Sequence, residues 1–229
     1  VPVVVGPPAA RRDLLAQRRH FSSKPFFHRR AVSPRGAARD SSPTEARMRV
    51  DVWSDVVCPW CYIGKRRLEA ALESFPGRDS VEVVFHSFQL DPSTPKGSTE
   101  TVDAMLARKY QLSPGQVAET QARVTRIAAG DGLEYLLDRA LTENTLDAHR
   151  LIHFAASHGR GQDLMERLMA AYFTEGRRVG DADSLVAICV EAGLDGDASR
   201  AVIDDPWAYA DAVRADQMEA RRLGIRGVP

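Results

Sequence analysis

Two cysteines separated by two residues are the first feature of this sequence that could do chemistry. They are Cys58 and Cys61, and Pro59 and Trp60 lie between them. Two intervening residues of helix bring such sulfur atoms close enough to form a disulfide, and a thiolate at the first position can attack another sulfur. We therefore expect Cys58 to be the nucleophile and Cys61 to be the cysteine that resolves a mixed disulfide.

The residues around this pair predict a strand before it and a helix after it. Apolar and charged residues alternate over 48–54, which indicates a strand. Apolar residues then recur at helical spacing as far as Phe75, and Pro59 suits the first helical turn, where its missing N–H would have no partner. Cys58 is therefore predicted at the amino end of a helix, where backbone N–H groups and the helix dipole favour its thiolate.

The rest of the chain predicts an α/β fold with a large helical part. A second strand is expected at 81–85, so that residues 48–97 form a strand–helix–strand unit with parallel strands. Residues 98–204 lose the strand pattern and carry helical ones instead. Residues 205–229 are expected to hold a return helix, opened by Pro206, and the start of a second half.

The composition excludes several classes of protein. With 229 residues, 44% of them apolar and 27% charged, the chain resembles soluble globular proteins. No stretch approaches the roughly eighteen uncharged apolar residues of a membrane helix, so we expect no membrane partner. Three cysteines are too few for a secreted scaffold with several disulfides. Because no targeting signal is recognisable, we expect a cytoplasmic protein, and in that compartment stable disulfides are rare and catalytic ones are the norm.

The first 47 residues differ from the remainder in charge. Residues 1–47 hold 10 Lys and Arg against 3 Asp and Glu, whereas residues 48–229 hold 21 against 28. The acidic body argues against nucleic-acid binding. We interpret residues 1–47, which are rich in proline and paired arginines, as a disordered extension. Their arginine-rich, acid-poor composition leaves an organellar transit peptide as an alternative.

A metal site is the main competing chemistry for the cysteine pair. Structural zinc needs four ligands, and the sequence has no second C-x-x-C. His149 and His153 share a helix face but lack the glutamate of an H-E-x-x-H motif. We therefore expect no metal, while a chemically idle C-x-x-C stays open. Cys189 falls on an apolar helical stripe and is predicted to be a buried hydrophobic residue.

The segment DVVCPWCYIG at 55–64 resembles the active-site segment of the DsbA-like thioredoxin-fold oxidoreductases, and most closely their FrnE-like branch. That branch is related to the 2-hydroxychromene-2-carboxylate isomerases and the kappa-class glutathione transferases. Further similar segments are FQLDP at 88–92, NTLDAHRL at 144–151, YFTEG at 172–176 and GVP at 227–229. Together they cover essentially all of residues 48–229.

This resemblance implies a thioredoxin-like fold with a large helical insertion at 98–204. It also implies that Pro229 is a cis-proline beside the redox pair, and that the backbone of Val228 is offered to the substrate. Members of the family continue past this proline, so we expect the sequence to be truncated there. The related isomerases and transferases carry serine at the position of Cys58, so the presence of both cysteines favours disulfide chemistry.

The two residues between the cysteines are expected to set the redox potential. Pro59-Trp60 is neither the Gly-Pro of reducing thioredoxins nor the Pro-His of the oxidising DsbA proteins. Trp60 offers an apolar surface and one N–H donor but no positive charge. We therefore predict a potential between those of thioredoxin and DsbA, about −270 and −120 mV.

Other residues near the predicted site have alternative roles. Asp55 is either a proton acceptor for the resolving thiol or a surface carboxylate at the strand end. Asn144 and His149 either line the substrate groove or serve as a capping asparagine and a packed histidine. Trp53 and Trp207 are expected in the core.

Thiol–disulfide oxidoreductase is the expected function, with a protein or a small-molecule thiol or disulfide as substrate. No bound cofactor is required, because glutathione, another low-molecular-weight thiol or a partner protein would recycle the pair. A homodimer is a further expectation. One alternative is a glutathione-dependent isomerase or transferase for an aromatic or polyketide substrate, whose turnover would survive loss of Cys61. Another is a non-catalytic thioredoxin-like adaptor or chaperone, whose client binding would survive loss of Cys58.

Overall fold

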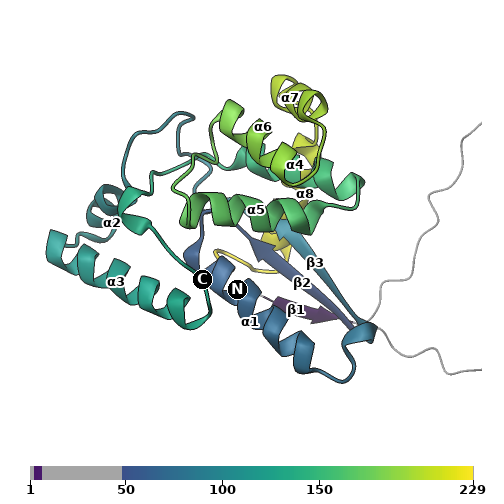
Figure 1. Ribbon diagram of the computed structural model, residues 1–229, viewed down its shortest axis with the longest axis horizontal. Helices are drawn as coiled ribbons and strands as arrows, with labels where there is room; N and C mark the ends of the chain where they lie inside the picture. The colour runs from purple at the N-terminus through teal and green to yellow at the C-terminus, as the bar shows by residue number, and fades with distance from the viewer. Residues whose placement is uncertain (1–2, 7–47, 229) are drawn as a thin grey trace, which may run out of the picture.

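The computed structural model describes residues 3–6 and 48–228. Three strands form one sheet, and helices account for most of the remaining structure (Figure 1). The elements are β1 (Val3–Gly6), β2 (Met48–Ser54), α1 (Pro59–Ser74), β3 (Val81–Ser87), α2 (Val102–Tyr110), α3 (Pro114–Gly130), α4 (Leu146–Ser157), α5 (Gly161–Phe173), α6 (Ala182–Glu191), α7 (Gly196–Asp204) and α8 (Ala210–Arg222).

The strand–helix–strand unit that carries the cysteines is the one predicted from the sequence. Strands β2 and β3 are parallel, with Val52 opposite Phe85, and α1 connects them. Helix α1 begins where predicted, because Cys58 has an extended backbone at the N-cap position and Pro59 opens the first turn. The valines of β2 point into the core, with Val50 and Val52 buried. This unit fixes the cysteine pair at the carboxyl end of β2.

Strand β1 differs from the expectation for the first 47 residues. Val3–Gly6 pairs antiparallel with β2, which makes β2 the central strand in the order β1-β2-β3. The interpretation of this part as a disordered extension is therefore wrong for Val3–Gly6. Valines suit a strand, and the second edge of β2 offers N–H and C=O groups for pairing. The same interpretation of residues 7–47 falls outside the described residues.

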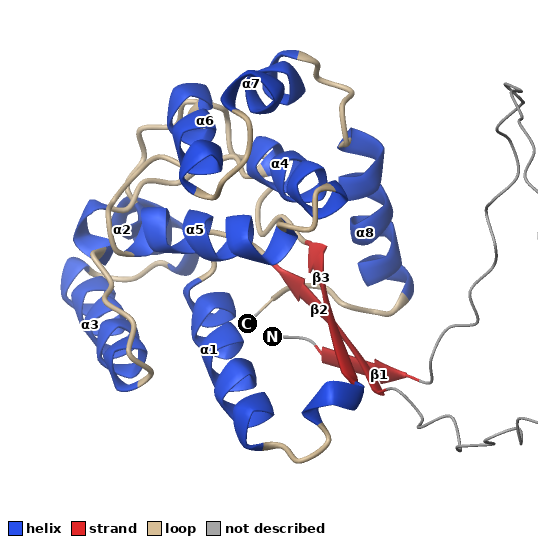
Figure 2. Ribbon diagram, turned by 45° about the vertical axis from the view of Figure 1, so that its right-hand side comes forward, coloured by secondary structure: helices blue, strands red, loops and turns tan. Residues whose placement is uncertain are grey.

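Helices α2 to α7 form a block at the carboxyl ends of β2 and β3. Helices α4, α6 and α7 gather on one side of α5, and α2 and α3 lie on the other (Figures 1 and 2). Leu151 of α4 and Leu164 and Leu168 of α5 are fully buried, and the same core continues through Ile63 of α1. The block and the cysteine-bearing helix therefore share one hydrophobic core. Among the described residues, no helix combines the length and apolar character of a membrane span.

The return helix starts later than the sequence predicts. A turn occupies the residues after Pro206, Tyr209 has a left-handed backbone with φ 58°, and α8 begins at Ala210. Trp207 lies on this turn and is 76% exposed, so the expectation that it is a core residue is wrong. Trp53 is buried as expected, and its indole N–H donates to the carbonyl oxygen of Asp216 in α8 at 3.0 Å.

Candidate active site at the cysteine pair

Cys58 and Cys61 lie together at the amino end of α1. Both are thiols, and both side chains are buried. The N–H of Cys61 donates to the carbonyl oxygen of Cys58 at 3.1 Å, and the N–H of Cys58 donates to that of Asp55 at 3.2 Å. The tight turn between β2 and α1 therefore holds the two sulfur atoms side by side, as the spacing of the cysteines predicts.

The two thiols titrate as one unit. A hydrogen bond from Cys58 lowers the pKa of the Cys61 thiol against the effect of burial, helped by the backbone of Asp55. The contact with Cys61 and burial raise the pKa of Cys58 well above its usual value. The sequence argument placed the lowered pKa on Cys58, and the structure places it on Cys61. The hydrogen bond between the two sulfur atoms makes the ionisation of each thiol depend on the protonation of the other.

Access to substrate separates the two cysteines. A groove of about 290 Å³ runs beside the motif, and Cys58, Pro59 and Trp60 form one wall of it. Residues of α2 and α3 also line it, both apolar ones such as Met105 and Val124 and polar ones such as Gln121. Cys61 lies behind Cys58 and, in the described part of the chain, does not belong to the lining. Cys58 is therefore the sulfur that a substrate in the groove would meet.

The end of the described chain returns to the same groove. Val228 lines it together with Cys58, although 170 residues separate them in sequence, and its side chain is 8% exposed. The sequence prediction that brings Val228 next to the cysteine pair is consistent with this position. Pro229, with its predicted cis bond, lies outside the described residues.

Asp55 and His149 form a buried pair beneath the motif. The Asp55 side chain is 1% exposed and that of His149 is fully buried, with 3.2 Å between Asp55 Oδ1 and His149 Nε2. The other carboxylate oxygen accepts a hydrogen bond from the backbone N–H of Leu90 at 2.7 Å. Asp55 is therefore not a surface carboxylate, because α4 and the segment at Leu90 cover the end of β2. His149 is fully buried and is not among the described residues that line the groove.

Asn144 and Cys189 have local roles away from the groove. The Asn144 side chain donates to the carbonyl oxygen of Thr94 at 2.7 Å and accepts from the N–H of Leu146 at 3.1 Å, which fixes the start of α4. Asn144 precedes the N-cap residue Thr145, so it braces the segment before α4 and is not itself the cap. Cys189 is fully buried in α6, and burial raises the pKa of its thiol to about 11. It is the buried hydrophobic residue that the sequence predicts.

Tyr135 is a site residue that the sequence analysis missed. Its side chain is 5% exposed, and its hydroxyl donates to the carbonyl oxygen of Pro59 at 2.8 Å. Burial is the main cause of its raised pKa, so the hydroxyl keeps its proton and stays a donor. This bond ties the C-x-x-C turn to the helical block. No local pattern marks it, because the two residues are 76 positions apart.

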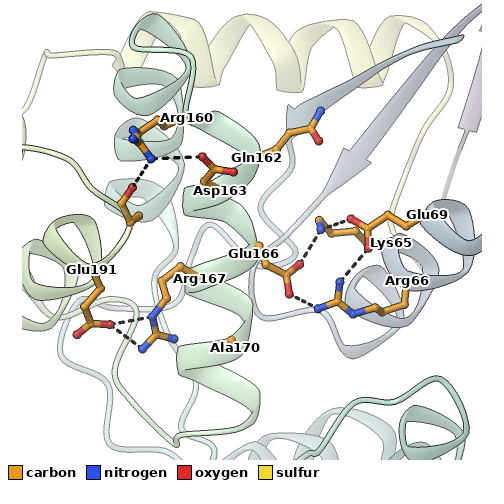
Figure 3. A pocket seen from close by; sticks show the side chains of 11 residues that line it. Lys65, Arg66, Glu69, Arg160, Gln162, Asp163, Glu166, Arg167, Ala170 and Glu191 are labelled. Atoms are coloured by element: carbon orange, nitrogen blue, oxygen red, sulfur yellow. Dashed lines mark hydrogen bonds and ion pairs between the residues drawn. The ribbon is translucent and has the colours of Figure 1, made fainter. Parts of the chain in front are cut away.

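A second cavity, of about 570 Å³, lies between α1 and α5 (Figure 3). Its charged side chains pair with one another: Glu166 of α5 binds Lys65 and Arg66 of α1, and Glu191 binds Arg167. None of the lining residues belongs to the C-x-x-C motif. The ion pairs of this cavity therefore connect α1 to the helical block.

Known proteins resemble this chain along most of its length. Residues 49–229 match the family model described as a DSBA-like thioredoxin domain. The structure of a probable DsbA oxidoreductase, SCO1869 from Streptomyces coelicolor, is 46% identical with a TM-score of 0.77, and the match covers 79% of this chain and 78% of that one. The uncharacterized protein YwbO from Bacillus subtilis strain 168 is 29% identical over 168 residues, which are 73% of this chain and 76% of that protein.

A more distant structure shares the fold. The cytosolic disulfide reductase DsbM from Pseudomonas aeruginosa, solved with GSH, is 22% identical with a TM-score of 0.53. The match covers 79% of this chain and 83% of DsbM. At this identity the similarity concerns the fold alone.

Proposed function

The chain belongs to the DsbA-like thioredoxin domain family, and from that premise we propose that it is a thiol–disulfide oxidoreductase. The predicted α/β fold, a thioredoxin-like fold with a helical insertion, is confirmed by the same match. One observation carries the proposal: Cys58 and Cys61 share a hydrogen bond at the end of β2, and only Cys58 of the two lines the groove in the described residues.

The proposed reaction passes two electrons between the cysteine pair and a substrate. The Cys58 thiolate attacks one sulfur of a substrate disulfide, whose S–S bond breaks and releases one substrate thiolate. Cys61 then loses its proton and attacks Cys58 in the mixed disulfide, which releases the second thiolate and leaves a Cys58–Cys61 disulfide. In the opposite direction the same steps oxidise two substrate thiols.

The Cys58–Cys61 disulfide must be reduced again after each such cycle. A low-molecular-weight thiol such as glutathione would return the disulfide to the dithiol, with no bound cofactor or metal. The distant relative DsbM, a cytosolic disulfide reductase solved with GSH, supports this part of the proposal by shared fold. We propose a protein or small-molecule thiol or disulfide as substrate, and the cytoplasm as the place of action.

Single cysteine variants test the proposal. After incubation with glutathione disulfide, Cys61→Ser should accumulate a glutathione adduct on Cys58, because no second thiol resolves it. Cys58→Ser should form no such adduct at the motif. Cys189→Ser is the matched control, since this thiol is fully buried in α6, and it should behave as the unchanged chain. Mass spectrometry of the intact protein and of its peptides would measure the glutathione adduct in all three variants.

Three results would contradict the proposal. Equal adduct formation by Cys58→Ser would remove Cys58 from its assigned role. Sustained turnover by Cys61→Ser would favour a glutathione-dependent isomerase or transferase, since that chemistry needs no resolving thiol. Client binding by Cys58→Ser without either reaction would favour an adaptor or chaperone.

A further inference from the structure

Helix α8 has one face in the core and one face in solvent. Val213 and Ala220 are buried, and the helix packs against α4 and β3. The indole N–H of Trp53 donates to the carbonyl oxygen of Asp216, which fixes the helix on the sheet. Figure 2 shows α8 at the outer margin of the helical block. Its outward face is therefore presented on a rigid element.

A surface hollow of about 520 Å³ runs along this outward face. The residues that line it all belong to α8 and follow one another at spacings of three, one, three, one and three positions. Such spacing places them on a single stripe of the helix surface. We call this set the α8 stripe: Asp211, Arg214, Ala215, Met218, Glu219 and Arg222.

The charges of the α8 stripe alternate in a way that is complementary to the same stripe reversed. From the amino end, the order of charge is negative, positive, negative, positive, carried by Asp211, Arg214, Glu219 and Arg222. In a second copy that runs antiparallel, Arg222 lies at the level of Asp211 and Glu219 lies at the level of Arg214. A parallel copy would instead place like charges at the same level, which is unfavourable.

The centre of the α8 stripe is complementary to itself in size. Ala215 and Met218 lie on either side of its midpoint, and the Met218 side chain is 60% exposed. Antiparallel reversal places the long Met218 side chain at the level of the small Ala215 of the other copy. The aliphatic stems of the neighbouring arginines extend this apolar surface. The middle of such a contact can therefore exclude water.

The charges of the stripe remain available to a second copy. Arg214 pairs with Asp211 at 2.7 Å and Arg222 with Glu219 at 2.6 Å, each across one turn of the helix. Exposed pairs of this kind contribute little to stability. Asp211 is 90% exposed and Arg222 is 74% exposed. Because a guanidinium has five N–H donors, each arginine can keep its own acid and also bind an acid of the other copy.

From this pattern we propose that the α8 stripe is the interface of a homodimer, in which two copies of the chain pack antiparallel about a twofold axis. A twofold contact uses the same surface on both subunits, so the surface must complement itself. The pair between Asp211 and the second copy's Arg222 then forms twice, once at each end of the contact. Among the described residues, no member of the stripe lines the groove at Cys58, so the inference is independent of the proposed function.

The size of the α8 stripe predicts a weak dimer. Helix α8 has 13 residues and is therefore about 20 Å long. One helix contact of this length buries less than the roughly 1,200–2,000 Å² of stable interfaces. We therefore expect a dissociation constant on the order of 10 µM. Because the charge pairs lie at the surface, this constant should increase with added salt.

Charge reversal in the full chain, followed by sedimentation equilibrium, tests this interface. The unchanged chain should be mostly dimeric at about 100 µM, roughly ten times the expected dissociation constant. Asp211→Arg and Arg222→Asp each place like charges together at both ends of the contact. Each variant alone should therefore be monomeric, with a dissociation constant more than about tenfold higher. An equal mixture of the two should form a heterodimer within about threefold of the unchanged dissociation constant, because opposite charges meet again at both ends.

Two further variants separate the interface from local effects on α8. The double variant Asp211→Arg/Arg222→Asp loses both ion pairs within the helix but should form a homodimer by itself. Asp183→Arg is the matched control, because Asp183 is exposed on α6 and pairs with Arg200 across to α7. This control should dimerise as the unchanged chain does.

Three results would overturn the inference. The unchanged chain could remain monomeric at the stated concentration, which would make the stripe an ordinary solvated helix face. Both single variants could dimerise as well as the unchanged chain, which would place the interface elsewhere. The mixture and the double variant could both remain monomeric, which would exclude the antiparallel pairing of Asp211 with Arg222.

Discussion

Glu166 connects the cysteine-bearing helix α1 to the helical block, and its replacement by glutamine should lower the stability of the folded chain. The carboxylate on α5 pairs with the ammonium of Lys65 at 2.6 Å and with Arg66 (Figure 3). It also accepts a hydrogen bond from the hydroxyl of Tyr62 at 2.7 Å. The Lys65 side chain is 5% exposed, so it has little access to water as a substitute. Glutamine keeps the shape of the side chain and removes its charge.

The size of the effect follows from this environment. Two unit charges about 4 Å apart attract by about 4 kcal/mol at an effective dielectric constant near 20. Desolvation of the half-buried carboxylate opposes part of this, and Glu69 remains as a second partner for Lys65 and Arg66. We therefore expect Glu166→Gln to lower the free energy of unfolding by about 2 kcal/mol, between the values for surface and buried pairs.

The stability that Glu166 contributes should depend on pH. Hydrogen bonds from Lys65 and Tyr62, acting against burial, hold the pKa of Glu166 below its usual value of 4.5. A carboxylate with a lowered pKa stabilises the folded state above that usual value, and this contribution is lost as the pH falls through the folded pKa. The difference between the unchanged chain and Glu166→Gln should therefore shrink in acid.

Urea unfolding followed by circular dichroism measures this difference. Glu191→Gln is the matched control, because Glu191 borders the same cavity and pairs with Arg167 and Arg177 near the surface. It should cost under about 1 kcal/mol. Equal losses in the two variants, or a loss in Glu166→Gln that persists at acid pH, would refute the reasoning.

Three further predictions follow from other buried polar groups. Arg150→Met should destabilise the chain by about 3–5 kcal/mol in urea unfolding, because it leaves Oδ1 of Asp147 and the carbonyl oxygen of Ala208 before α8 without their buried donor, while Lys96 keeps only Oδ2 of Asp147; a loss under about 1 kcal/mol would contradict this. Asp216 raises the pKa of His86 against the effect of burial. In thermal unfolding the unchanged chain should therefore exceed His86→Asn in stability by the full margin below about pH 6.5, and this margin should fall at higher pH. A margin that does not change with pH would contradict this prediction. Cys189, with a pKa of about 11, should resist alkylation in the folded chain and react once unfolded, as read by mass spectrometry.

The parts of the fold that the sequence predicts are those set by local patterns. Alternation of apolar residues identified β2, and Pro59 followed by apolar residues at helical spacing identified the start of α1. The C-x-x-C spacing identified the two sulfur atoms of the site for the same reason, since two residues of helix determine their separation.

The parts that the sequence does not predict depend on contacts between distant segments. The burial of Asp55 requires the cover supplied by His149, which is 94 residues away, and Tyr135 reaches the motif from the helical block. Trp207 has the residue type of a core position, but it falls on a turn that the left-handed backbone of Tyr209 separates from α8. Neither periodicity nor residue type contains this information.

A redox titration of the Cys58–Cys61 pair in the full chain tests the central claim most directly. Samples equilibrated at defined potentials would be trapped with a thiol reagent, and mass spectrometry would give the fraction of disulfide. We predict a single two-electron transition between about −270 and −120 mV. A folded sample that forms no Cys58–Cys61 disulfide at any potential would contradict the account.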